Sequence, residues 1–331
     1  VLVLSCFSLA AGPVRTHAAD EHTYYVHAVE GDDDNHDGSE NAPFATMLKA
    51  FQAIESEGTI VLLSDVTLSS MLDLNAGKTV TIESASGGQR KIVRDTNNTE
   101  ILIYIRGGAE VTFRNVVIDG NHVPAPNNNN AAIYANGGTA IFENAVVENH
   151  LITSNGNGRF VIFASGGSGR VVIEDGTLIR NNKITGRHED NPPSILAAGT
   201  TGRLIIEGGL ISGNTVEGNS NGVIVGIGLA GSPSFTMTGG KITENYLYGN
   251  GLNANGATVG NVAVYMRGKA SEAAFRFGGT AYVYGNTNEA GEQRNVFLKN
   301  EAATGSAYLE LIEALTEGAK IGVFANIMPT S

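Results

Sequence analysis

Hydrophobic and polar residues alternate over short stretches along most of the chain, which is the pattern of half-buried β-strands. In the stretch from Val111 to Asn115, Val111 and Phe113 are expected to point inward and Thr112 and Arg114 outward. Such a stretch is repeatedly followed by a corner of Gly or Asn, then by a second short strand and a closing Asn. The chain is therefore predicted to consist of repeated β-strand units.

Six segments align in this pattern and define a repeat of about 30 residues. They are residues 111–121, 141–149, 171–181, 204–214, 235–245 and, more loosely, 275–286. We predict that the closing asparagines stack side chain on side chain in a ladder, although the preference of Asn for tight turns explains their recurrence equally well. These asparagines are Asn121, Asn149, Asn181, Asn214, Asn245 and Asn286.

The length of the repeat determines the expected architecture. A strand rises about 3.3 Å per residue, so about 30 residues can form one coil with three short strands. Successive coils then stack about 4.8 Å apart and pair in parallel, which predicts an all-β parallel β-helix over residues 58–331. Polar stretches at 121–130, 185–193 and 246–257 are expected to be loops that project from this solenoid.

The region in front of the repeats has a different pattern. Apolar residues at Leu48, Phe51 and Ile54 predict an amphipathic helix from about Thr46 to Glu57, with Thr46 as its N-cap. Residues 20–57 are thus predicted to form an N-terminal cap with an Asp-rich loop and one helix.

The order of residues in this cap, from Tyr24-Tyr25-Val26 through the Asp-rich loop to Pro43-Phe44-Ala45-Thr46, resembles the opening of bacterial right-handed parallel β-helix proteins with the pectate-lyase-like fold. Adhesin-like cell-surface proteins belong to this family. The resemblance implies that residues 20–57 close one end of a right-handed solenoid and that residues 58–290 form its coils. It also makes the C-terminus a candidate truncation point.

The Asp-rich loop is a candidate calcium site. Asp32, Asp34 and Asp37 could place carboxylate oxygens around a hard cation. Asx turns that bond to their own backbone explain the same composition without a metal. We expect no other cofactor.

Residues 1–19 are apolar and end in small residues, so they are predicted to be an incomplete signal peptide. A buried strand or helix, or a lipoprotein signal at Cys6, is the alternative. Cys6 is the only cysteine, which excludes disulfides and cysteine metal sites in a mature chain. We expect a secreted, cell-surface-associated protein without a transmembrane span.

Charge and composition limit the partners. The net charge is −12 and the pI about 5.0, whereas nucleic-acid binding requires clustered Lys and Arg, so no nucleic-acid partner is expected. Glycans or cell-surface proteins remain as expected partners. Sugars often bind to exposed aromatic rings, and the pair Tyr246 and Tyr248 is the candidate ligand-binding site.

Catalytic signals are weak. The Gly-His-Gly element of polygalacturonase-type sites is absent. For a calcium-dependent lyase, which needs carboxylates from adjacent coils and a basic residue, the candidates are Asp119, Asp175 and Arg180. His122, His150 and His188 are expected in loops, exposed and without partners. The predicted function is non-catalytic, adhesive or structural, and the alternative is a lyase or epimerase acting on acidic polysaccharide.

Overall fold

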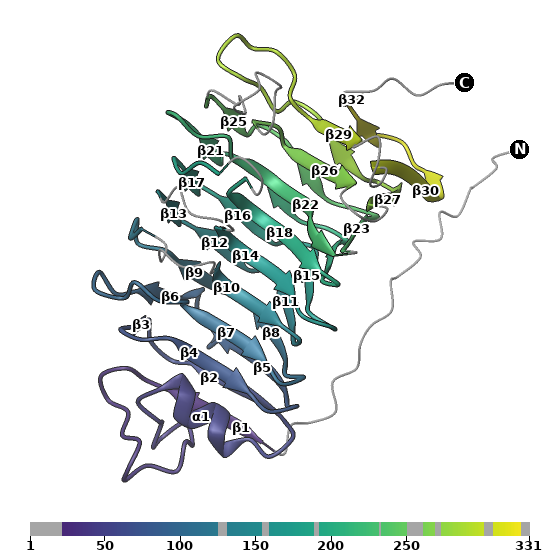
Figure 1. Cartoon of the computed structure of the whole chain (residues 1–331). Helices are drawn as coiled ribbons and strands as arrows, with labels where there is room; N and C mark the ends of the chain where they lie inside the picture. The colour runs from purple at the N-terminus through teal and green to yellow at the C-terminus, as the bar shows by residue number, and fades with distance from the viewer. Residues whose placement is uncertain are drawn as a thin grey trace, which may run out of the picture.

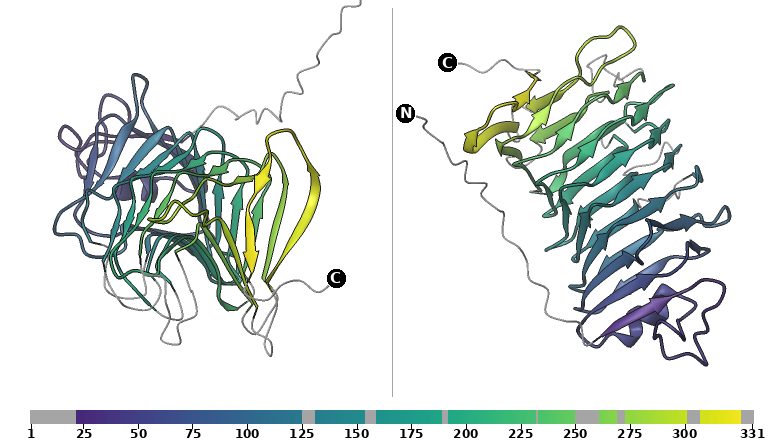
Figure 2. Two further views of the ribbon diagram at one scale, coloured as in Figure 1. Left: turned by 90° about the horizontal axis from the view of Figure 1, so that it is seen from above. Right: turned by 180° about the vertical axis from the view of Figure 1, so that it is seen from behind.

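A computed structural model describes residues 22–124, 131–153, 159–188, 192–231, 233–249, 261–268, 273–300 and 307–325. The chain is a solenoid of stacked parallel coils with one short helix at its N-terminal end (Figure 1). The same stack of coils is seen from behind in Figure 2. The predicted all-β parallel β-helix with a short capping helix is therefore confirmed.

Three long sheets run along the solenoid. The ten-stranded sheet comprises β1 (Thr23–Val26), β2 (Glu57–Leu62), β5 (Thr79–Ser84), β8 (Glu110–Arg114), β11 (Thr139–Glu143), β15 (Arg170–Ile173), β19 (Arg203–Ile206), β23 (Ser234–Met237), β27 (Ala273–Gly279) and β30 (Ala307–Leu315).

The second sheet follows the first along each coil and is called the ladder sheet, because the asparagine ladder begins just beyond it. It comprises β3 (Val66–Leu68), β6 (Arg90–Arg94), β9 (Val116–Asp119), β12 (Val146–Glu148), β16 (Leu178–Arg180), β20 (Leu210–Ile211), β24 (Lys241–Ile242), β28 (Tyr282–Val283) and β31 (Lys320–Ile321).

The third sheet carries a row of outward-facing aromatic residues and is called the aromatic sheet. It comprises β4 (Leu72–Asn75), β7 (Ile103–Arg106), β10 (Ala131–Asn136), β14 (Phe160–Ser165), β18 (Ser194–Thr200), β22 (Val223–Gly231), β26 (Val264–Gly268), β29 (Val296–Asn300) and β32 (Val323–Ala325).

A fourth, short sheet was not expected. It holds β13 (Leu151–Ile152), β17 (Lys183–Ile184), β21 (Thr215–Val216) and β25 (Tyr246–Leu247). Tyr246 thus begins a strand rather than a loop. Of the predicted loops, residues 125–130, 189–191 and 250–257 lie outside the described residues.

The alternating residues form the core as predicted. Val111 and Phe113 are fully buried, and their partners in the adjacent coil, Ala140 and Phe142, are fully buried too. The same inward column continues through Val171 and the coils beyond. Because the inward residues of every coil pack against each other and against those of the adjacent coils, the core is a continuous apolar column along the axis.

The helix α1 (Met47–Ala53) covers the N-terminal end of this column. Thr46 is its N-cap, as predicted, and the Thr46 side chain accepts a hydrogen bond from the Lys49 backbone at 3.1 Å. The helix ends before the predicted Glu57, because Ile54 has an extended backbone and Glu57 already pairs with Thr79 as the start of β2.

Candidate functional site

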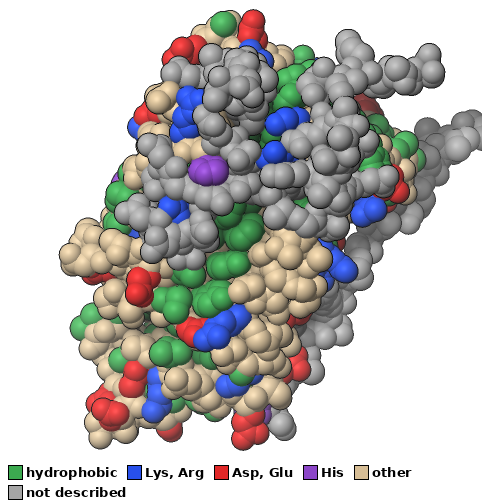
Figure 3. Space-filling model, viewed as in Figure 1, with side chains coloured by type: hydrophobic (Ala, Val, Ile, Leu, Met, Phe, Trp, Pro, Cys, Tyr) green, Lys and Arg blue, Asp and Glu red, His purple; other side chains and the backbone are tan. Residues whose placement is uncertain are grey.

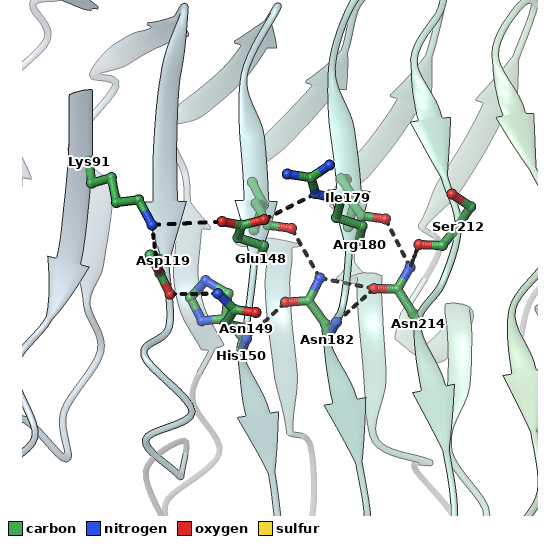
Figure 4. Close-up of polar contacts among 11 residues, drawn as sticks. Lys91, Asp119, Glu148, Asn149, His150, Ile179, Arg180, Asn182, Ser212 and Asn214 are labelled. Atoms are coloured by element: carbon green, nitrogen blue, oxygen red, sulfur yellow. Dashed lines mark hydrogen bonds and ion pairs between the residues drawn. The ribbon is translucent and has the colours of Figure 1, made fainter. Parts of the chain in front are cut away.

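A row of charged side chains crosses four adjacent strands of the ladder sheet (Figure 4). Lys91 on β6 lies 3.0 Å from the Oδ2 of Asp119 on β9 and 4.0 Å from the Oε1 of Glu148 on β12. Arg180 on β16 places its Nε 3.0 Å from the Oε2 of Glu148. Parallel register causes this alignment, since Glu148 lies opposite Asp119 on one side and opposite Arg180 on the other.

Asp119 is bound on both of its carboxylate oxygens. Its Oδ1 accepts hydrogen bonds from the Asn121 backbone at 2.9 Å and from the Asn149 side chain at 3.0 Å, and its Oδ2 faces Lys91. Burial alone would raise the pKa of Asp119, but these hydrogen bonds and the Lys91 charge hold it below its usual value. The hydrogen bond to Asp119 likewise raises the pKa of Lys91. The row is a satisfied ionic network.

The structure brings together two of the three predicted catalytic residues. Asp119 and Arg180 belong to one row, but Asp175 lies in the turn between β15 and β16, where its backbone carbonyl accepts a bond from Asn144. Sequence reasoning missed Glu148, which stands between Asp119 and Arg180. Aligning the segments Val117-Ile118-Asp119 and Val146-Val147-Glu148 places the two carboxylates in register and could have found it.

Next to this row, buried side-chain amides form the predicted ladder, whose beginning is drawn in Figure 4. The Nδ2 of Asn182 donates to the Oδ1 of Asn214 at 2.9 Å, and Asn214 donates in the same way to Asn245 at 2.9 Å. Asn245 donates to Asn286 at 2.8 Å, and Asn286 to Asn295 at 3.0 Å. Each amide also donates to a backbone carbonyl of the preceding coil, such as Asn182 to Val147 at 3.1 Å. The ladder thus connects this corner of four successive coils, since Asn286 and Asn295 belong to the same coil.

The ladder prediction was right for Asn214, Asn245 and Asn286 and wrong for the other three residues. The other three lie outside the ladder column. Their backbones are left-handed, with φ of 52° at Asn121, 60° at Asn149 and 55° at Asn181. Asn is tolerated in that conformation because its short polar side chain bonds locally. Asn182 is the ladder member in the coil of Asn181.

His150 occupies the ladder position in the coil before Asn182. Its backbone N–H donates to the Oδ1 of Asn182 at 3.0 Å. Its ring hydrogen-bonds to the carbonyl of Ile118 in the preceding coil, just as each ladder amide bonds to a carbonyl of the coil before it. The side chain is 3% exposed, so the expectation of an exposed loop histidine was wrong. Burial, followed by the positive charge of Arg94, lowers the pKa of His150 to about 3, so the ring is neutral near pH 7.

Arg94 lies in the core close to this end of the ladder. It is 1% exposed, and its Nη1 donates to the carbonyls of Asn98 and Glu100 at 2.9 and 2.8 Å. Burial lowers its pKa to about 10, which leaves the guanidinium charged near neutral pH. Gly120, which follows β9, allows its coil to approach the coil of His150 closely. A Cβ at Gly120 would lie 2.6 Å from the Cα of His150.

A row of half-buried aromatic side chains lies on the outer surface of the aromatic sheet. Tyr104, Tyr134 and Phe163 are register partners on β7, β10 and β14, and their ring centroids are 5.3 and 5.1 Å apart. Phe160 stacks on Phe163 at 4.2 Å. Phe160, Ala131 and Ala197, with Tyr134 and Phe163 packed against them, form an apolar cluster separate from the core. Hydrophobic side chains also gather in the space-filling view where Figure 1 places β7 and β10 (Figure 3).

Polar groups border one end and one side of this aromatic row. Arg106 donates to both carboxylate oxygens of Asp73 at 2.9 and 2.6 Å, and its guanidinium lies 5.3 Å from the Tyr104 ring centroid. Asn136 donates to the Tyr104 hydroxyl at 2.7 Å. Arg106 and Asp73 remain 41% and 30% exposed, so both can also bond to an external partner. This combination of ring edges with fixed donors and acceptors suits a ligand with apolar and hydroxyl faces.

Of the predicted ligand pair, Tyr246 begins β25 of the short sheet and Tyr248 directly follows this strand. Their ring centroids are 5.7 Å apart, and Tyr246 is 43% exposed, while Leu247 between them points into the core. The two rings therefore project together from the surface, which keeps them a candidate contact for ligands.

The Asp-rich loop forms hydrogen-bonded turns. Asp32 accepts hydrogen bonds from the Asn35 side chain at 2.8 Å and from the backbones of Asp34 and Asn35 at 2.8 and 3.0 Å. The bond from the Asn35 side chain, followed by the two backbone bonds, lowers the pKa of Asp32 to about 2. Asp37 accepts from the Ser39 backbone at 3.0 Å. Within the described residues, no group of three or more His, Cys, Asp or Glu side chains is arranged to hold a metal. Calcium binding stays a prediction.

Comparisons with known proteins add little to this description. No family model matches the sequence, and no curated protein matches it. Among solved structures, the native GH136 lacto-N-biosidase from Eubacterium ramulus aligns with 92% of this chain and 67% of its own, at 10% identity and a TM-score of 0.35. A likeness of this degree carries no argument about the site. Within the described part of the chain, no helix has the length and apolar character needed to cross a membrane.

Proposed function

We propose that the chain is a non-catalytic, secreted solenoid that binds neutral glycans on the outer surface of the aromatic sheet. The observation that carries the proposal is the row of Tyr104, Tyr134 and Phe163, stacked in register and bordered by the Asp73–Arg106 pair. Sugars present apolar C–H faces and hydroxyl edges, so they fit a surface that alternates ring carbons with hydrogen-bonding groups.

The charge of the chain favours neutral sugars over acidic polysaccharides. A net charge of −12 repels polyanions at long range, and the Arg106 guanidinium on this surface is already paired with Asp73. Neutral hydroxyls can still accept from Arg106 and donate to Asp73 without breaking that pair. An adhesive role at a bacterial cell surface, with a removed leader at residues 1–19, accords with the family resemblance of the cap and is part of this proposal.

The test uses the whole chain and a panel of immobilised oligosaccharides, neutral ones such as galactan, xylan and N-acetyllactosamine fragments beside polygalacturonate and alginate. We expect binding to at least one neutral glycan and its loss, by ten-fold or more, in Tyr134→Ala. Tyr282→Ala, a half-buried tyrosine of the ladder sheet, is the matched control and should bind as the wild type does. Absence of binding to every neutral glycan, or unchanged binding in Tyr134→Ala, contradicts the proposal.

A calcium-dependent lyase or epimerase is the second candidate, favoured by one observation. Asp119 and Glu148 come from adjacent coils and both lie within 4.0 Å of Lys91, as acid–base chemistry on a uronate requires. Lys91 and Arg180 neutralise these two carboxylates, and both carboxylates are largely buried. This weighs against the enzyme, because a reacting group must be free to exchange its proton. Incubation with polygalacturonate and alginate, with and without calcium, decides: unsaturated product that is lost in Glu148→Gln would replace the binding proposal by the enzymatic one.

A further inference from the structure

The aromatic row repeats once per coil along the solenoid axis. Tyr104, Tyr134 and Phe163 lie opposite one another on the neighbouring strands β7, β10 and β14, so the row runs straight across three coils (Figure 1). The ring centroids are 5.3 and 5.1 Å apart, slightly more than the about 4.8 Å between neighbouring strands. The surface therefore presents one aromatic edge at each step of the solenoid.

A line of polar side chains runs beside these rings. Arg106 follows Tyr104 by two residues, and Asn136 follows Tyr134 in the same way, which places both polar side chains on the same face as the rings. Arg106 and Asn136 are register partners, and Ser165, which is 7% exposed, continues the line in the third coil. One ring edge and one polar group per coil suit one sugar residue, which has apolar C–H groups and hydroxyl edges.

The row is bounded at both ends. Asp73 on β4 occupies the register position before Tyr104 and ends the row with a carboxylate. Ala197 on β18 occupies the position after Phe163 and is 1% exposed, so it adds no ring to the surface. Tyr265, three coils beyond Phe163 on the same line, is fully buried. The accessible row is therefore three coils long.

We propose that the aromatic row binds an extended glycan that lies along the solenoid axis, with one sugar residue over each of its three coils. This inference rests on the proposed function and names the class of its ligand. A glycan is straight when each sugar is linked through equatorial bonds at opposite ends of its ring, as in cellulose, xylan and chitin. Such a chain advances per residue by nearly the distance between the rings of the row.

The match of periods determines which glycans can use all three rings. Once the first sugar is bound, a straight chain delivers the second and third to their rings at a high effective concentration. A chain that bends at each linkage, as in amylose or laminarin, leaves the row after one or two residues. The affinity should therefore rise steeply from one to three sugars and then level off, since the row ends at Asp73 and Ala197.

Isothermal titration calorimetry of the whole chain with soluble oligosaccharides tests the proposal. Cello-, laminari- and malto-oligosaccharides consist of the same glucose units and differ only in their linkage. Xylose and N-acetylglucosamine oligomers, each with the straight linkage and with a bent one, extend the comparison to other sugars. For each sugar that binds, we expect the straight trimer to bind about ten-fold or more tighter than its bent isomers. Lengthening it from three to six units should change the affinity by less than about two-fold.

Variants of the row test whether its rings count the sugars. Tyr104→Ala and Phe163→Ala each remove one end ring, so the advantage of the trimer over the dimer should disappear. Tyr134→Ala removes the middle ring and should weaken both ligands. Tyr282→Ala, on the ladder sheet, is the matched control and should keep the full dependence on chain length. Circular dichroism establishes that each variant is folded, and if Phe163→Ala does not fold, Tyr104→Ala decides alone.

Three results would overturn this inference and leave the binding of neutral glycans intact. They are equal affinity for straight and bent isomers, an affinity that keeps rising beyond three units, and a preference for the trimer that survives in Tyr104→Ala. Absence of binding to every oligosaccharide, straight or bent, would instead contradict the proposed function, and the inference would fall with it.

Discussion

The backbone N–H of His150 donates to the Oδ1 of Asn182 at 3.0 Å, which joins a histidine to the end of a ladder of asparagines. The imidazole takes the place that a carboxamide occupies in each later coil, and its own ring bonds to the carbonyl of Ile118. A titratable group therefore terminates a network of otherwise neutral amides inside the core.

We predict that His150 makes the fold sensitive to acid. Its pKa falls from the ordinary value near 6.5 to about 3 in the folded chain, so the unfolded chain binds the proton first. The stability present above about pH 6.5 should then decline by about 1.4 kcal/mol per pH unit as the pH falls towards 3. In His150→Asn this part of the pH dependence should disappear.

Urea denaturation at pH 7, 5 and 4 measures the effect. His122→Asn is the control, since His122 is exposed and its φ of 55° suits Asn. An acid dependence of the same slope in wild type and His150→Asn would show that another group causes it.

The position of the ladder can be tested by placing glycine at two neighbouring sites. Asn181→Gly should change the free energy of unfolding by less than about 1 kcal/mol, because glycine adopts the left-handed backbone of Asn181 freely. Asn182→Gly should cost about 2–4 kcal/mol, because His150 loses an acceptor, Val147 loses a donor and the backbone gains freedom. Equal effects at both sites, measured by urea denaturation, would refute the assignment.

Gly120 is predicted to be irreplaceable even by alanine. A Cβ at this position would meet the Cα of His150 at 2.6 Å and the carbonyl of Asn149 at 2.7 Å, and backbone atoms cannot move aside cheaply. Gly120→Ala should destabilise the chain by about 3 kcal/mol or more. Gly167→Ala is the control, since nothing lies within 4 Å of a Cβ there, and its melting temperature should match the wild type.

The ionic row should depend on Asp119 more than on Lys91. Asp119→Asn turns an amide N–H group towards one of the donors that now bind the carboxylate, and should lower the free energy of unfolding by about 1–3 kcal/mol. Lys91→Met removes a cation that is 42% exposed, and should lower it by less than about 1 kcal/mol. Because the folded pKa of Asp119 is lowered, its contribution is present above the ordinary Asp value and is lost as the pH falls below it. Denaturation at pH 7 and 3 measures both effects, and a larger loss in Lys91→Met would contradict this ranking.

The fold was predictable because one pattern decides it in every coil. The alternation seen at Val111 and Phe113 recurs with the spacing of a single turn, and parallel stacking is the arrangement that buries all these residues together. The N-cap at Thr46 was predictable for a similar reason, since capping depends on local sequence.

The site was less predictable because it depends on register between coils. Asn181 and Asn182 are adjacent asparagines, and only the left-handed backbone of the first assigns the ladder to the second. Glu148 gained its importance from its neighbours Asp119 and Arg180, which are far from it in sequence. The aromatic row likewise becomes visible only when strands β7, β10 and β14 are laid side by side.

The ladder also has a polarity. Along the ladder, each carboxamide from Asn182 to Asn286 accepts on its Oδ1 from the member before it and donates from its Nδ2 to the member after it. The amide dipoles are consequently parallel and sum along the axis, with their negative pole near the guanidinium of Arg94 and their positive pole towards Asn295. This stack of uncharged side chains therefore carries a net dipole along the solenoid axis, and its negative end favours the buried guanidinium of Arg94.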